Sequence, residues 1–153
     1  MIDSDLTGHL QGFMVFIRGH VAAEIPDRGT FDPYGILLKQ EAGGMQMVFI
    51  ESRDDSDEML KGQPARQTMR WVEDQIRRFR DDPSVVSAAI VVDSHLRPAE
   101  GGAGREAVRV WLDDRGQQAA YVLIFYVVED GKFRIVEETF EPRDPLFLRP
   151  IVG

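Results

Sequence analysis

An acid, a serine and a histidine are adjacent in the segment VVDSHL. Asp93, Ser94 and His95 are the residue types of a nucleophilic catalytic triad. In an extended strand, however, successive side chains point to opposite faces, so Asp93 and His95 share one face while Ser94 lies on the other. The three neighbours therefore cannot form a triad among themselves. Asp93 and His95 remain a candidate catalytic pair that could orient a general base, and the alternative is an ordinary polar end of a strand.

The glycine-rich loop RPAEGGAGRE, residues 97–106, could suggest a phosphate-binding site. Such a site needs its glycines between a strand and the first turn of a helix, where backbone N–H groups converge on the anion. The segment that follows, REAVRVWL, instead alternates apolar and other side chains with the period of a strand. The loop is therefore predicted to be a hairpin connection.

Metal sites are not indicated. The acidic run DDSDE, residues 54–58, lacks the ligand spacing of an EF-hand loop, and acids also favour the start of a helix. His9 and His20 lie on one predicted helix but about 16 Å apart at a rise of about 1.5 Å per residue, so they cannot share one ion. The sequence predicts neither a metal nor a cofactor.

Composition limits the class of protein. The chain has 153 residues, 43% of them hydrophobic, which predicts a single domain over residues 1–153. The absence of cysteine excludes disulfides, thiolate catalysis and cysteine-based zinc sites. A net charge of -8 argues against binding to nucleic acid or to anionic membranes. With no long apolar run and no secretory signal, we expect a cytoplasmic protein.

Two helices are predicted from apolar residues that recur every three or four positions. The first covers residues 6–24, with Asp3 and Ser4 as candidate caps and an end at Pro26 and Gly29. The second covers residues 65–80, where an apolar face is accompanied by charged pairs at i and i+4.

The rest of the chain is rich in strand-forming residues. The predicted strands are 34–40, 45–52, 85–95, 106–112, 120–129 and 132–140. Residues 121–128 are apolar at every position, so their strand should be central and buried on both faces. Residues 141–153 contain three prolines and are predicted to form an irregular tail.

The predicted order is α-β-β-α-β-β-β-β. Short links between strands favour antiparallel pairing. We therefore predict an α+β fold of two layers, with two helices packed on a mainly antiparallel sheet of about six strands.

Trp111 and Arg109 share one face of their strand. If the helices cover one face of the sheet, this second face must be buried by the proline-rich tail or by another chain. The sequence therefore predicts self-association as a homodimer, with Trp111, Arg109 and Phe147 at the interface.

The segments TFDPYGILL, PARQTMRWVEDQI, AAIVVD and REAVRVWLDDRG together resemble a group of small bacterial proteins of unassigned function. The resemblance implies a single α+β domain. It implies no catalytic residue, because the group has none established.

The leading hypothesis is a cytoplasmic binding or assembly protein without chemistry of its own, acting as a homodimer. The alternative is a hydrolase-like enzyme that binds a small molecule in a pocket between helices and sheet, using Asp93 and His95. A third possibility, compatible with the acidic charge, is an acidic protein that binds a basic protein partner.

Overall fold

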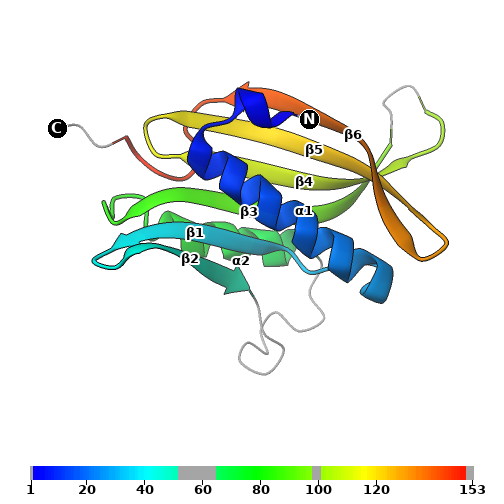
Figure 1. The fold of residues 1–153 in the computed structure, drawn as a ribbon, viewed down its shortest axis with the longest axis horizontal. Coiled ribbons are helices and arrows are strands. Elements are labelled where there is room, and N and C mark those ends of the chain that lie inside the picture. Colours follow the sequence, from blue (N-terminus) through cyan, green and yellow to red (C-terminus); the bar gives the residue numbers. More distant parts are fainter. Residues whose placement is uncertain (1, 52–64, 98–100, 151–153) are drawn as a thin grey trace.

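A computed structural model describes residues 2–51, 65–97 and 101–150 of the chain. Its six strands form one antiparallel sheet in the order β2-β1-β3-β4-β5-β6 (Figure 1). The predicted α+β class and element order are confirmed. The elements are a short 3-10 helix, η1, Ile2–Asp5; the helices α1, Gly8–Arg28, and α2, Ala65–Arg77; and the strands β1, Tyr34–Glu41, β2, Gly44–Glu51, β3, Val85–Leu96, β4, Arg105–Asp114, β5, Gln118–Glu129, and β6, Lys132–Arg143.

The two helices lie on opposite faces of the sheet, which corrects the predicted two-layer arrangement. α1 contacts β3, β4 and β6 on one face, and α2 contacts β1, β2 and β3 on the other (Figure 1). The reason lies in β3, whose apolar side chains point both ways: Val91 packs with α1, and Ile90 packs with α2. A strand buried on both faces needs a cover on each side.

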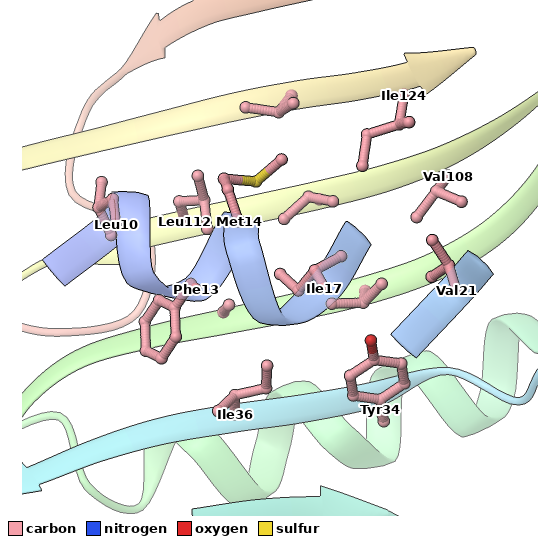
Figure 2. Close-up of a cluster of buried hydrophobic side chains, with 14 of the residues drawn as sticks. Leu10, Phe13, Met14, Ile17, Val21, Tyr34, Ile36, Val108, Leu112 and Ile124 are labelled. Carbon is pink, nitrogen blue, oxygen red and sulfur yellow. The ribbon is translucent and has the colours of Figure 1, made fainter. Parts of the chain in front are cut away.

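The core beneath α1 is the larger of the two. Leu10, Phe13, Met14, Ile17 and Val21 form the predicted stripe, and all are buried against the sheet (Figure 2). Even-numbered residues of β4 and β5 supply the opposing surface.

α1 begins and ends differently from the prediction. Its N-cap is Thr7, whose Oγ1 accepts a hydrogen bond from the Leu10 N–H, so Asp3 and Ser4 belong to the preceding 3-10 helix. The helix continues through Pro26 to Arg28. Gly29 then ends it with φ at +82°, a left-handed conformation that glycine adopts without a steric penalty.

α2 packs on β1 and β3 through the predicted face, which includes Val72 and Ile76. It ends at Arg77, three residues before the predicted end. A short turn follows, in which the Phe79 N–H donates to the Ile76 carbonyl oxygen. Glu73 and Arg77 form the expected i, i+4 ion pair at 2.8 Å.

The irregular segment after β6 completes the core beneath α2. β6 runs through Pro142 to Arg143, beyond the predicted end at Phe140, because an edge strand tolerates a residue without an N–H donor. In residues 144–150, Phe147 and Leu148 are buried beside α2. The predicted tail therefore begins three residues later than expected, and residues 151–153 lie outside the described residues.

Two polar side chains near the end of β4 hold this segment. The Asp113 carboxylate Oδ2 accepts hydrogen bonds from the N–H groups of Leu146, Phe147 and Leu148, at 3.0, 2.7 and 3.0 Å. The Arg115 guanidinium donates to carbonyl oxygens of the α2–β3 connection, of the first residue of β3 and of the C-terminal segment. These acceptors belong to Phe79, Arg80, Asp82, Val85 and Arg149.

β5 lies second from one edge of the sheet and not at its centre. Its even-numbered side chains, such as Val122 and Ile124, are buried beneath α1. Its odd-numbered side chains from Tyr121 to Val127 are only half-buried. The prediction of burial on both faces is thus wrong for this strand, because α2 covers β1 and β3 instead.

Candidate functional site

Asp93 and His95 lie on the α1 side of β3, as strand alternation predicts, but the structure gives each a different partner. The Asp93 carboxylate accepts hydrogen bonds from the hydroxyls of Tyr126 and Thr30, each at 2.7 Å. These bonds connect β3 to β5 and to the α1–β1 connection. Burial, followed by the hydrogen bond to Asp93, raises the pKa of the Tyr126 hydroxyl, which therefore keeps its proton and acts as a donor.

His95 is exposed at the end of β3. Its Nδ1 is hydrogen-bonded to the Glu106 carboxylate, which is its direct partner in the β3–β4 register. The ring lies against Gly104, where a Cβ atom would overlap it. Neither side chain borders the cavities at the C-terminal half of α1, beside β6 or next to the C-terminal segment.

The predicted interface residues Arg109 and Trp111 lie on the α2 side of the sheet, beyond the strands that α2 covers. We call this surface of β4, β5 and β6 the open face. Its side chains are Arg105, Arg109, Trp111, Tyr121, Leu123, Phe125, Glu137, Thr139, Glu141 and Arg143. They are half-buried or exposed.

Arginines stack on aromatic rings across the open face. The Arg105 guanidinium lies 3.8 Å from the centre of the Phe125 ring, and that of Arg109 lies 4.6 Å from the Trp111 ring. Arg109 also donates to the Tyr121 hydroxyl at 2.7 Å. The face of an aromatic ring attracts a cation electrostatically, and the planar guanidinium also covers apolar ring surface. The face is thus an ordered layer of rings and charges.

Phe147 lies in a different environment from the other two predicted interface residues. It is only 6% exposed, because it packs within its own chain beside α2. Together with Leu146 and Met69 it borders a small cavity that reaches one side of Trp111. The C-terminal segment and α2 therefore both lie beside Trp111, and the rest of the open face lies farther along β4, β5 and β6.

A polar group that sequence analysis missed lies near the start of α1. The Asp114 carboxylate Oδ1 accepts a hydrogen bond from Ser87 at 2.8 Å and lies 3.1 Å from His9 Nδ1. The carboxylate therefore stands between serine and histidine, whereas a catalytic triad needs the histidine in the middle. Its members are separated by up to 105 residues, so no local pattern in the sequence could have indicated it.

A second missed group lies at the other end of α1. His20 Nδ1 is 3.1 Å from the Tyr34 hydroxyl, and the two rings meet edge to face. They border a cavity of about 220 Å³. Helical spacing alone placed His20 on a flank of the first helix, and only the fold brings its ring to Tyr34, the first residue of β1.

Within residues 2–51, 65–97 and 101–150, no group of three or more His, Asp or Glu side chains could hold a metal ion. The acidic run at 54–58 lies outside the described residues. No helix in the described part of the chain is long and apolar enough to cross a membrane.

Comparisons with protein-family models, with curated proteins and with solved structures found no match to this chain. The resemblance to small bacterial proteins of unassigned function therefore stays a prediction.

Proposed function

We propose that the protein is a binding or assembly protein and that it works as a homodimer through the open face. The single observation that carries this proposal is the organised layer of arginines and aromatic rings on β4, β5 and β6, which α2 does not cover. Apolar and aromatic side chains with interspersed arginines are typical of the centre of protein interfaces.

The charges on the open face favour a second copy of the chain as the occupant. β4 contributes Arg105 and Arg109, whereas β6 contributes Glu137 and Glu141. A two-fold axis parallel to β5, between two facing sheets, sets β4 of one copy opposite β6 of the other. Basic and acidic columns then face each other twice, which steers association and fixes the register. Within one chain, Arg105 pairs with Glu137 at 3.1 Å, and Arg143, which stacks on Tyr121, pairs with Glu141 at 3.4 Å.

The test is the mass of the protein in solution, measured by size-exclusion chromatography with light scattering at about 100 µM. We expect twice the chain mass of 17.3 kDa. Leu123 is half-buried at the middle of the open face, between Arg109 and Thr139. Leu123→Arg should give monomers, because it buries an additional charge in the interface.

A matched control is Val15→Arg, since Val15 is 65% exposed on α1, on the opposite side of the sheet. That variant should remain dimeric. A wild-type protein that stays monomeric at about 100 µM, or a folded Leu123→Arg variant that stays dimeric, would overturn the proposal.

The enzyme hypothesis is not supported by a comparable observation. Asp93 is hydrogen-bonded to Tyr126 and Thr30, and His95 is paired with Glu106 at an exposed strand end. The Asp93 interactions connect β3 to β5 and to the α1–β1 connection.

A further inference from the structure

β2 and β6 are the two edge strands of the sheet, and no strand in the part of the chain that the structure describes pairs with their outer sides (Figure 1). An edge strand offers unpaired N–H and C=O groups to any extended chain, so proteins usually protect it with charges, proline or a bulge. β6 has all three. It carries charged side chains along its length, Pro142 near its end, and a register irregularity opposite Phe125 and Tyr126.

β2 has none of these protections. Residues 44–50 include no charged residue and no proline, and their register with β1 is unbroken. We call the outer side of these residues the β2 edge. Met45 and Phe49 are 49% and 44% exposed, and Met47 between them is half-buried. All three lie on the α1 side of the sheet, where the Phe49 ring is 5.1 Å from that of Phe16. The β2 edge is therefore apolar and unprotected.

The direction of the backbone groups of β2 follows from its neighbours. The Gln40 N–H donates to the Ser84 carbonyl oxygen on the β3 side of β1, at 2.7 Å. Because the direction alternates along an antiparallel strand, odd-numbered residues of β1 face β2, and their even-numbered partners in β2, such as Val48, face β1. The N–H and C=O groups that point to the β2 edge therefore belong to Met45, Met47 and Phe49.

We propose that the β2 edge pairs with the same edge of a second copy of this chain, antiparallel and across a two-fold axis at Met47. This register sets Met47 opposite the partner's Met47, and Met45 opposite the partner's Phe49. The outward N–H and C=O groups of both chains then meet as hydrogen-bonded pairs. Apolar side chains face one another across the new contact, and Glu51 stays outside the paired segment.

Two features favour a second copy over another extended chain. The β2 edge is uncharged, so two copies meet without like charges opposite each other. A two-fold pairing also uses both β2 edges, and the protected β6 edges prevent further addition, so the assembly closes.

The β2 contact is separate from the open face on β4, β5 and β6, and its existence does not depend on the homodimer proposed above. It uses residues 44–50 of each chain, far fewer than the about 20–30 residues a side of a standard interface. We therefore expect it to be the weaker contact and to form at about millimolar protein.

The first test is disulfide trapping. The chain contains no cysteine, so one introduced cysteine can form a disulfide only between copies. The two Cα atoms of a hydrogen-bonded antiparallel pair lie about 5.5 Å apart, which suits a disulfide. With oxidised glutathione as the oxidant, Met47→Cys should form covalent dimers at least about tenfold faster than Val136→Cys, a matched control at an exposed residue of β6. Equal rates would overturn the proposal.

The register is tested by two further variants. Met45→Cys and Phe49→Cys place their thiols opposite each other only when the two variants are mixed. In either variant alone, four residues, or about 13 Å, separate the two thiols. The mixture should therefore form covalent dimers faster than each variant alone, and equal rates would show random collision and overturn the proposed register.

Sedimentation equilibrium at about 1 mM measures the association without a covalent bond. The Leu123→Arg variant is used, because it removes the open-face contact, and its mass should rise from one chain toward two. Adding Met47→Lys should raise the dissociation constant at least about tenfold, because two like charges then meet at the axis. Mixing it with the corresponding Met47→Glu protein should restore association.

A Leu123→Arg protein that stays monomeric at about 1 mM would overturn the β2 proposal and leave the open-face proposal intact. A mixture of the lysine and glutamate variants that associates no better than either alone would also overturn it. Conversely, wild-type protein that is monomeric at about 100 µM, yet associates at about 1 mM through Met47, would overturn only the open-face proposal.

Discussion

Asp113 carries a carboxylate that is almost fully buried, at 1% exposure, yet its Oδ2 accepts three backbone N–H groups. A buried charge of this kind stabilises a structure only while it is fully hydrogen-bonded. Because all three donors belong to residues 146–148, the carboxylate fixes the path of the C-terminal segment over the sheet.

Asp113→Ala should therefore lower the free energy of unfolding by about 3 kcal/mol, because it leaves buried N–H groups without an acceptor. Urea unfolding measures this loss. Asp144→Ala, at an exposed position of the same segment, should change the stability by less than about 0.5 kcal/mol. Equal effects of the two substitutions would contradict the role given to Asp113.

Arg18 connects three parts of the chain through its guanidinium. It donates to the Glu138 carboxylate on β6, at 2.8 and 2.9 Å, and to the Asp3 carboxylate in η1, at 3.2 and 2.6 Å. The hydrogen bonds from Arg18 hold the pKa of Asp3 below its ordinary value of 3.8. The Asp3 interaction is thus complete only while the carboxyl is ionised.

The lowered pKa of Asp3 determines how the stability depends on pH. The folded-state pKa of Asp3 is lower than the unfolded-state value, so its contribution is present above pH 3.8 and is lost as the pH falls through the folded-state pKa. Asp3→Asn should remove this part of the dependence and flatten stability against pH below about 4. Urea midpoints measured across that range provide the test, and an unchanged slope would contradict it.

At the residue scale, the sequence predicts side-chain direction better than side-chain partners. Strand alternation correctly set Asp93 and His95 on one face. Their partners Tyr126 and Glu106 come from other strands, and that pairing depends on register. The His20–Tyr34 contact forms because α1 crosses over β1. The periodicity of a single helix does not predict that crossing.

α2 sits close to β1 because Gly35 lacks a side chain. A Cβ at Gly35 would come within 2.9 Å of both Ile76 Cδ1 and Val72 Cγ1. Helix and strand therefore approach more closely than any larger residue would allow.

Gly35→Ala should overpack this contact and cost about 1–3 kcal/mol. Gly12→Ala should instead increase the stability, since a Cβ there meets nothing within 4 Å and alanine favours the helix by about 1 kcal/mol relative to glycine. Thermal or urea unfolding of the two single variants measures both. A Gly35→Ala protein as stable as the wild type would show that α2 does not pack as closely as the structure has it.

At the element scale, the order of helices and strands could be predicted, because each has its own periodicity and turn residues. Asp130 and Gly131, with φ at 53° and 74°, form the hairpin turn that their sequence indicates. Which face each helix covers could not be predicted in this way. It depends on the strand order, and β1 pairs with β3 across the intervening α2.

For the whole molecule, the two faces of the sheet are covered unequally. The core beneath α1 is larger than the core that α2 and the C-terminal segment form on the other face. The sequence predicted an uncovered side chain at Trp111, and the C-terminal segment and α2 both lie beside it. The remaining open face lies on β4, β5 and β6, and in the proposed dimer its ordered charges would contribute to association together with the buried area.

Reversing one charge of the acidic column should therefore weaken the dimer. Glu141→Arg removes an exposed carboxylate from β6 and places a cation where the basic column of the second copy is expected. We expect a dissociation constant at least about tenfold higher by sedimentation equilibrium. Asp27→Arg makes the same change of charge on α1 and should leave the constant within about threefold; equal weakening would indicate that net charge alone matters.

The strand order has a kinetic consequence. β3, β4 and β5 each pair with the next strand along the chain, so the β3–β6 part of the sheet forms by closing short hairpins. Short closures cost little entropy and favour early folding. The β1–β2 hairpin joins only through β3 and after the longer closure across α2. We therefore expect native-state hydrogen exchange to divide the single sheet, with the slowest amides in β4 and β5 and the first local opening at β2.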